Sequence, residues 1–180
     1  MTQNKIKVLD KEFKISIPAA TIDAAIKNIA DKINVDYRDK NPLFLIVLNG
    51  AFMFASDLLK KIEVNCEITF VKLSSYSGTT STHTVRELIG LDESLEGREI
   101  IIVEDIIDTG ITMGNTIPKL HHLKAKDVKI ATLLFKPKAF QKDYKIDYVG
   151  LEIENDFIVG YGLDYDSYGR NLADIYKIVE

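Results

Sequence analysis

Hydrophobic residues occur along this chain in two alternating patterns. The segments 43–48 and 100–103 are apolar at every position, which is typical of strands covered on both faces in a parallel sheet. Between residues 19 and 35, isoleucines spaced by three or four positions predict one buried helix face, formed by Ile22, Ile26, Ile29 and Ile33. Strands that alternate with helices in this way predict an α/β domain.

The remaining strands and helices are predicted from the same hydrophobic patterns and from turn-forming residues. Turn-forming pairs such as Asn41-Pro42 and Asn49-Gly50 separate the elements. Further strands are predicted at 66–73, 128–135, 146–151 and 157–161, and further helices at 51–62 and 113–123. The expected fold is an open, mainly parallel sheet flanked by helices.

Composition narrows the class of protein. A chain of 180 residues with 46% hydrophobic content is expected to form a single domain, residues 1–180. Its net charge of −4 offers no basic field for nucleic acid. The one cysteine, Cys66, cannot form an internal disulfide, which favours a reducing cytoplasmic location. The polar segment 1–11 resembles neither a signal peptide nor a membrane span, so no membrane association is expected.

Acidic residues follow the apolar segment 100–103. Glu104 and Asp105 are expected at its carboxyl end, where ligands bind in sheets of this kind. Asp108, Thr109, Gly110 and Thr112 then lead into the helix predicted at 113–123. Amides and hydroxyls at the start of a helix favour an anion, so this loop predicts a phosphate site.

Carboxylates beside a phosphate loop need a further ligand to explain them. They repel phosphate, but they bind Mg²⁺ and accept hydrogen bonds from sugar hydroxyls. The loop has no Gly-Lys-Ser/Thr ending and no dinucleotide fingerprint, which excludes those two nucleotide sites. A phosphorylated sugar satisfies both the acids and the loop.

Residues 103–112, Val-Glu-Asp-Ile-Ile-Asp-Thr-Gly-Ile-Thr, resemble the phosphoribosyl pyrophosphate signature of the purine phosphoribosyltransferases, in the hypoxanthine-guanine form. The resemblance implies the type I phosphoribosyltransferase fold, with a small hood built from the N-terminal and C-terminal segments. It also implies a flexible lid loop at about 74–84, in which Ser75 and Tyr76 match the family's Ser-Tyr pair. A closing lid would keep water away from the reactive sugar.

The resemblance also assigns a purine pocket. Lys136 follows the strand predicted at 128–135, at the position of the family's purine-binding lysine. An ammonium only donates hydrogen bonds, so it accepts the O6 of hypoxanthine or guanine and rejects the amino group of adenine. Residues 157–165 match the family's second motif, in which Phe157 would stack on the base and the backbone at Ile158 would read its edge.

Pyrophosphate and metal ligands complete the implied site. Asp164 matches the family's metal-linked aspartate and joins Glu104 and Asp105 as an expected Mg²⁺ ligand. Arg170 matches an arginine that reaches the pyrophosphate. Many relatives have Lys-Gly where this chain has Asn49-Gly50, so pyrophosphate contacts there are expected from the backbone, without a side-chain charge.

The implied reaction transfers the phosphoribosyl group from phosphoribosyl pyrophosphate to N9 of hypoxanthine or guanine, giving IMP or GMP in purine salvage. Glu104 and Asp105 would hold the ribose hydroxyls, and Asp108 would take up the N7 proton as N9 attacks. The backbone and hydroxyls of one loop would bind the 5′-phosphate: Asp108, Thr109, Gly110, Ile111 and Thr112.

Two alternatives stay open at this stage. A xanthine-preferring phosphoribosyltransferase would share the sugar loop and differ at the base pocket. A regulatory protein on the same fold would bind nucleotide and RNA, although this chain has no cluster of basic residues to support it. Relatives assemble as homodimers or homotetramers, and the sequence does not decide between the two.

Overall fold

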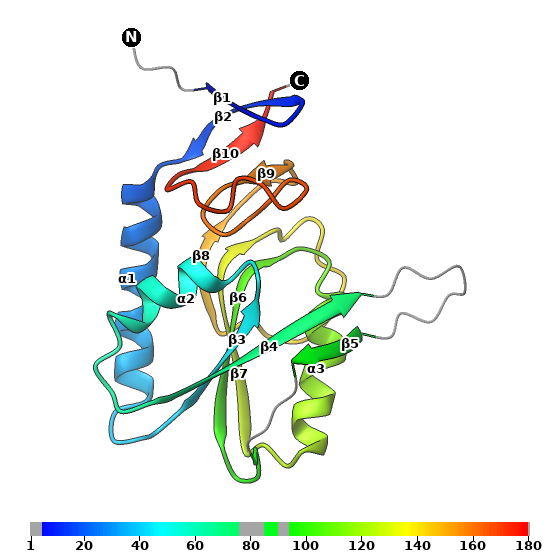
Figure 1. The fold of residues 1–180 in the computed structure, drawn as a ribbon. Helices are drawn as coiled ribbons and strands as arrows, with labels where there is room; N and C mark the ends of the chain where they lie inside the picture. The colour runs from blue at the N-terminus through cyan, green and yellow to red at the C-terminus, as the bar shows by residue number, and fades with distance from the viewer. Residues whose placement is uncertain (1–4, 76–84, 90–93, 180) are drawn as a thin grey trace.

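The computed structural model describes residues 5–75, 85–89 and 94–179, and the side chains of 74–75 and 85–89 are outside that description. Its main sheet has the strand order β5-β4-β3-β6-β7-β8 (Figure 1). All neighbours are parallel except β5, which runs antiparallel to β4. The strands are β3 (Leu43–Leu48), β4 (Glu67–Ser75), β5 (Val85–Ile89), β6 (Glu99–Ile107), β7 (Asp127–Phe135) and β8 (Tyr148–Glu152).

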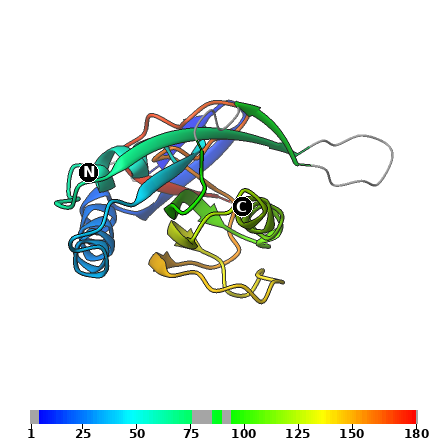
Figure 2. The ribbon, with the colours of Figure 1, turned by 90° about the horizontal axis from the view of Figure 1, so that it is seen from below.

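Within the described ranges, three helices cover the two faces of this sheet. The helices α1 (Ala19–Asp36) and α2 (Phe52–Leu59) pack on one face, and α3 (Ile111–His122) packs on the other (Figures 1 and 2). Along β3, Phe44 and Ile46 point into the first core, whereas Leu43 and Leu45 point into the second. Both sets are almost fully buried, which explains why this strand is apolar at every position.

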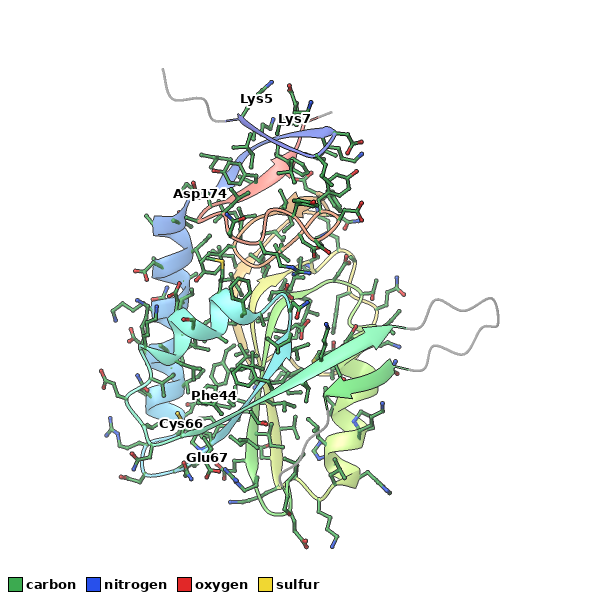
Figure 3. All side chains as sticks on the ribbon, in the orientation of Figure 1. Lys5, Lys7, Phe44, Cys66, Glu67 and Asp174 are labelled. Atoms are coloured by element: carbon green, nitrogen blue, oxygen red, sulfur yellow. The ribbon has the colours of Figure 1, made fainter. Side chains whose placement is uncertain are left out.

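A second, antiparallel sheet joins the two ends of the described chain. Its order is β1-β2-β10-β9, and it lies beyond the carboxyl ends of the parallel strands (Figure 1). The small sheet and the amino ends of the parallel strands lie at opposite ends of the molecule (Figure 3). Lys5, Lys7 and Asp174 lie at the small sheet, and Cys66 and Glu67 lie at the amino ends of the parallel strands. The strands are β1 (Lys5–Val8), β2 (Lys11–Ile17), β9 (Ile158–Val159) and β10 (Ile175–Ile178).

The predicted fold class is confirmed, and the differences lie in element bounds and in the small sheet. The strands β1, β2, β5 and β10 were not predicted, because each is short or amphipathic, and the pairing of β2 with β10 joins segments distant in sequence. The helix predicted at 51–62 is shorter, and the strand predicted at 157–161 is reduced to two residues. The assignment of residues 1–180 to one domain stays a prediction.

Two of these differences affect the site. The strand β6 does not end at Val103 but continues through both acids to Ile107, because its backbone keeps pairing with β7 as far as Phe135. The helix α3 begins at Ile111 rather than Met113, directly after Gly110, whose φ of 79° places it in the left-handed region. None of the helices in the described ranges is long and apolar enough to cross a membrane.

Candidate active site

The carboxyl ends of the parallel strands bring the predicted site residues to one edge of the sheet. Asn49 and Gly50 follow β3, Asp108 follows β6, and Lys136 follows β7. The parallel register pairs Ile107 with Phe135, so Asp108 and Lys136 leave neighbouring strands at the same level. Residues far apart in the sequence therefore meet because the sheet aligns the strand ends.

Glu104 and Asp105 form an acidic pair that has little compensation from the protein. The Oε2 atom of Glu104 is buried and has no hydrogen-bond partner. Burial, reinforced by the charge of Asp105, raises the pKa of Glu104 well above its usual value. Burial also raises the pKa of Asp105 to about 6, although the Ile106 amide donates to its Oδ1 at 2.8 Å. Such a pair needs a cation or hydroxyl donors from outside the chain.

Gly50 leaves the space that Asp105 occupies. A Cβ atom at residue 50 would collide with Oδ2 of Asp105, and one at Gly162 would collide with the carbonyl oxygen of Gly50. The peptide bond between Leu48 and Asn49 is cis. The loop after β3 thus lies directly between the acids of β6 and the C-terminal segment, where only a glycine backbone fits.

Four residues of the phosphate loop line a small hollow: Asp108, Thr109, Gly110 and Thr112. Glu104, Ile106, Ile107 and Met113 complete its lining. Gly110 caps α3, and its carbonyl accepts the first helical hydrogen bond, from Gly114, at 2.9 Å. The first amides of a helix have no intrahelical acceptor. These amides, with the nearby threonine hydroxyls, make the loop suitable for an anion.

Lys136 is buried, at 8% exposure, and its ammonium bridges two segments. Its Nζ lies 3.6 Å from Oδ2 of Asp108 and donates to the carbonyl oxygen of Asp156 at 3.1 Å. A buried ammonium would be costly without partners. The structure therefore joins the two residues predicted to read the purine, and joins them to the segment that carries Phe157.

Phe157 stands at the centre of an aromatic group. Its ring centroid lies 6.3 Å from that of Phe13 and 5.8 Å from that of Tyr165, the latter edge to face. Phe157 is nevertheless 46% exposed, so part of its ring is free for another aromatic surface. Ile158 is buried in β9 and pairs with Lys177 of β10.

Asp164 and Arg170 are paired with each other. Nη2 of Arg170 lies 2.7 Å from Oδ1 of Asp164, and Nη1 donates to the carbonyl oxygen of Gly162 at 2.6 Å. The Ser167 amide donates to the other carboxylate oxygen of Asp164 at 2.7 Å. The positive charge of Arg170 also lowers the pKa of Asp105, against the larger effect of burial. The roles of Asp164 toward a metal and of Arg170 toward pyrophosphate stay predictions.

The carboxylates at this end of the sheet suit a hard divalent cation that takes only some of its ligands from the protein. Among the described residues, no three His, Cys, Asp or Glu side chains gather as a metal cage. Mg²⁺ commonly uses one or two carboxylates and takes its remaining ligands from water and substrate phosphates. Glu104, with its partnerless oxygen, and Asp105 fit that chemistry.

Some site features escaped sequence analysis, and some predictions cannot be placed. The partners of Phe157, and the contact of Tyr144 with Gly110, arise from segments that are distant in sequence and gave no local signal. The lid was predicted at about 74–84, but residues 74 and 75 continue β4, because the antiparallel pairing with β5 extends to Ser75. The rest of the predicted lid, 76–84 with Tyr76, lies outside the described residues, as does the Ser75 side chain.

Comparison with known proteins agrees with this geometry. The sequence profile described as "Phosphoribosyl transferase domain" matches residues 18–166, so the chain belongs to the phosphoribosyltransferase family. A hypoxanthine-guanine phosphoribosyltransferase of Bacillus subtilis (strain 168) is 42% identical over 163 residues, which cover 90% of this chain and 91% of the relative.

Solved structures extend the likeness to three dimensions. A hypoxanthine-guanine phosphoribosyltransferase from Bacillus anthracis has a TM-score of 0.87 at 35% identity, covering 92% of this chain and 98% of the other. A hypoxanthine phosphoribosyltransferase from Staphylococcus aureus gives the same TM-score and identity, covering 92% and 91%. The fold is therefore the type I phosphoribosyltransferase fold implied by the sequence.

Proposed function

We propose that this chain is a purine-salvage phosphoribosyltransferase, which transfers the phosphoribosyl group from phosphoribosyl pyrophosphate to N9 of hypoxanthine or guanine. The observation that carries the proposal is the contact between Lys136 and Asp108, 3.6 Å apart at neighbouring strand ends. It supports the proposal because Lys136, the proposed base-reading residue, lies beside the loop that we propose binds the phosphate. The similar proteins from Bacillus subtilis and Bacillus anthracis, named for this activity, support it.

The Lys136–Asp108 pair matches one edge of a 6-oxopurine. O6 and N7 are adjacent on that edge of the ring. An ammonium donates to O6, while a carboxylate accepts from a protonated N7. Adenine presents an amino group in place of O6, and a buried ammonium facing it would be left unpaired. Phe157, partly exposed above the same segment, supplies a ring face for stacking.

The catalytic role falls to Asp108. As N9 attacks C1 of the ribose, N7 becomes more acidic, and the Asp108 carboxylate accepts its proton. The C1–pyrophosphate bond breaks as the C1–N9 bond forms from the opposite face, so the configuration at C1 inverts. General-base help of this type is worth ~10²–10⁴ in rate. The loop amides from Gly110 to Thr112 would hold the 5′-phosphate during the transfer.

Mg²⁺ fits the acidic pair, and Glu104 and Asp105 would hold it together with the ribose hydroxyls. When bound, it neutralises charge on the departing pyrophosphate. Asp164 would join them, although its two oxygens are engaged by Arg170 and the Ser167 amide. Arg170 and the backbone of Asn49 and Gly50 would contact the pyrophosphate.

The direct test incubates the protein with phosphoribosyl pyrophosphate and Mg²⁺ and, separately, hypoxanthine, guanine, xanthine or adenine. We expect IMP and GMP by chromatography, with adenine unreacted and no product when EDTA replaces Mg²⁺. Xanthosine monophosphate as the main product would favour the xanthine-preferring alternative. Absence of every nucleotide product would overturn the proposal.

We further propose that the enzyme is a cytoplasmic homodimer or homotetramer. Cys66 is a free thiol, which suits a reducing compartment. Phe52 of α2 and Ile68 and Phe70 of β4 are each more than 40% exposed, and large exposed apolar residues of this kind often mark association surfaces. Light scattering coupled to gel filtration measures the assembly, and a monomer at assay concentration would contradict it.

A further inference from the structure

The segment after β7 is bonded to the backbone of the phosphate loop at three points. The Lys136 amide donates to the carbonyl oxygen of Ile107 at 2.9 Å, and the Gln141 amide donates to that of Thr109 at 3.1 Å. The third donor is a side chain: the hydroxyl of Tyr144 donates to the carbonyl oxygen of Gly110 at 2.9 Å. The sheet register accounts for the first bond, but not for the other two.

These bonds determine where the amides of the loop point. A trans peptide is planar, so its N–H lies opposite its carbonyl oxygen. The carbonyl of Gly110 accepts from both the Tyr144 hydroxyl and the Gly114 amide, so the N–H of Ile111 points the other way, and the Gln141 bond does the same for the N–H of Gly110. These are two of the amides at the start of α3 that have no intrahelical acceptor, and the Ile111 amide makes only a long bond, of 3.5 Å, to the Thr109 hydroxyl.

Neighbouring rings hold the Tyr144 hydroxyl in place. Phe135, Phe140 and Tyr144 stack edge to face in series, with centroid distances of 5.3 and 5.2 Å. A Cβ atom at Gly110 would lie 2.5 Å from the Phe140 ring and 2.8 Å from the Tyr144 hydroxyl oxygen. Both rings are thus in direct contact with the backbone of Gly110, and burial raises the pKa of Tyr144 to about 12.

We infer that Tyr144 is a positioning residue for the 5′-phosphate: its hydroxyl fixes the Gly110–Ile111 peptide so that the Ile111 amide faces the phosphate. Phe140 supports the ring from behind. Tyr144 itself does not contact the substrate. This inference rests on the proposed function, because it assumes that the loop binds the phosphate of a phosphoribosyl group.

The test compares Tyr144→Phe with Tyr148→Phe. Each variant removes one hydroxyl and keeps the ring, but the Tyr148 hydroxyl bonds to Asp36, away from the phosphate loop. Calorimetry measures the affinity for IMP, which has the 5′-phosphate, and for inosine, which lacks it. Loss of one neutral hydrogen bond predicts about a fivefold weaker affinity for IMP in Tyr144→Phe. Its affinity for inosine, and both affinities of Tyr148→Phe, should equal those of the wild type.

Kinetics and a second variant complete the test. The KM of Tyr144→Phe for phosphoribosyl pyrophosphate should rise about fivefold while its KM for hypoxanthine stays constant. Phe140→Leu, which keeps the hydroxyl and loosens the ring, should shift the same parameters in the same direction by less. Unchanged IMP affinity in Tyr144→Phe, or an equal loss for IMP and inosine, would overturn the inference. An inactive wild type would instead refute the proposed function, and the inference with it.

Discussion

The two glutamates of β6, which lie toward opposite ends of the parallel sheet, differ in their charged neighbours. On β6, Glu99 lies at the amino end, where its carboxylate is paired with Lys126 at 2.9 Å and Lys40 at 3.5 Å. Oε2 of Glu99, like that of Glu104 five residues further along the same strand, is buried without a hydrogen bond, but among the ion pairs of the described residues only Glu99 has ammonium groups beside it. The hydrogen bond from Lys126 lowers the pKa of Glu99, whereas burial raises that of Glu104.

This contrast separates charges that serve the fold from charges that serve a ligand. The amino end also pairs Arg98 with Glu67 at 3.0 Å and Lys129 with Asp36 at 3.7 Å. At the carboxyl end, Oε2 of Glu104 has no hydrogen-bond partner, and part of the Phe157 ring is not covered by the protein. A site that must bind sugar, metal and base keeps such capacity unused by the chain itself.

The largest expected effect comes from the ammonium at the carboxyl end. Lys136→Gln replaces a donor-only group with an amide that also accepts, so discrimination between hypoxanthine and adenine should fall by up to ~10⁴. The measurement is the ratio of kcat/KM for the two bases. Lys138→Gln, which removes an exposed ion pair with Glu154, is the matched control and should leave the ratio unchanged. Intact 6-oxopurine preference in Lys136→Gln would remove Lys136 as the selector.

Asp108→Asn removes the proposed proton acceptor and keeps its size. We expect kcat to fall by ~10²–10⁴ while KM changes little. Steady-state kinetics with saturating Mg²⁺ measures both parameters. Asp127→Asn, at the amino end of β7, should keep wild-type kcat, because we infer that charges at that end of the sheet stabilise the fold and do not contact substrate. An unchanged kcat in Asp108→Asn would exclude Asp108 as the base.

Gly50→Ala tests the close packing between the acids and the loop after β3. The new Cβ would displace the Asp105 carboxylate, and displacements of this kind lower activity by ~10². The control is Gly114→Ala in α3, because its Cβ would make only ordinary contacts, at 3.6 Å or more, with the side chains of Lys142 and Tyr144. The measurement is kcat/KM for phosphoribosyl pyrophosphate. Wild-type activity in Gly50→Ala would show that the Asp105 position is not critical.

The smallest effects concern stability, and they should have opposite signs at the two ends. The folded-state pKa of Glu104 is raised, so its stabilisation is present below the unfolded value and lost as pH rises through the folded one. Glu104→Gln should therefore raise the Tm of metal-free protein at pH 8 by about 2–4 °C for each kcal/mol recovered, and not at pH 4.

The folded-state pKa of Glu99 is lowered, so its stabilisation is present above the unfolded value and lost as pH falls. Glu99→Gln should lower Tm at pH 8, with a smaller difference from wild type at pH 4. Calorimetric melting of both variants at pH 4 and pH 8, in EDTA, gives the two signs. Equal signs at pH 8 would contradict the division between the ends.

The sequence alone determined the parallel core and the residues that follow its strands. Strands covered on both faces must be apolar throughout, so 43–48 and 100–103 were recognisable without tertiary information. The phosphate loop was recognisable for a similar reason, since its glycine and threonines are local in sequence. The residues assigned from the family resemblance, such as Lys136, followed from short motifs.

Tertiary structure decided what no local pattern encodes. The small sheet pairs β2 with β10 across most of the chain length, and its residues gave no local signal of that pairing. Burial and neighbouring charges raise the pKa of Glu104 and lower that of Glu99, although both are glutamates on the same strand. The bond from Tyr144 to Gly110 joins residues 34 positions apart. Such properties depend on which segments meet, and only the folded chain brings them together.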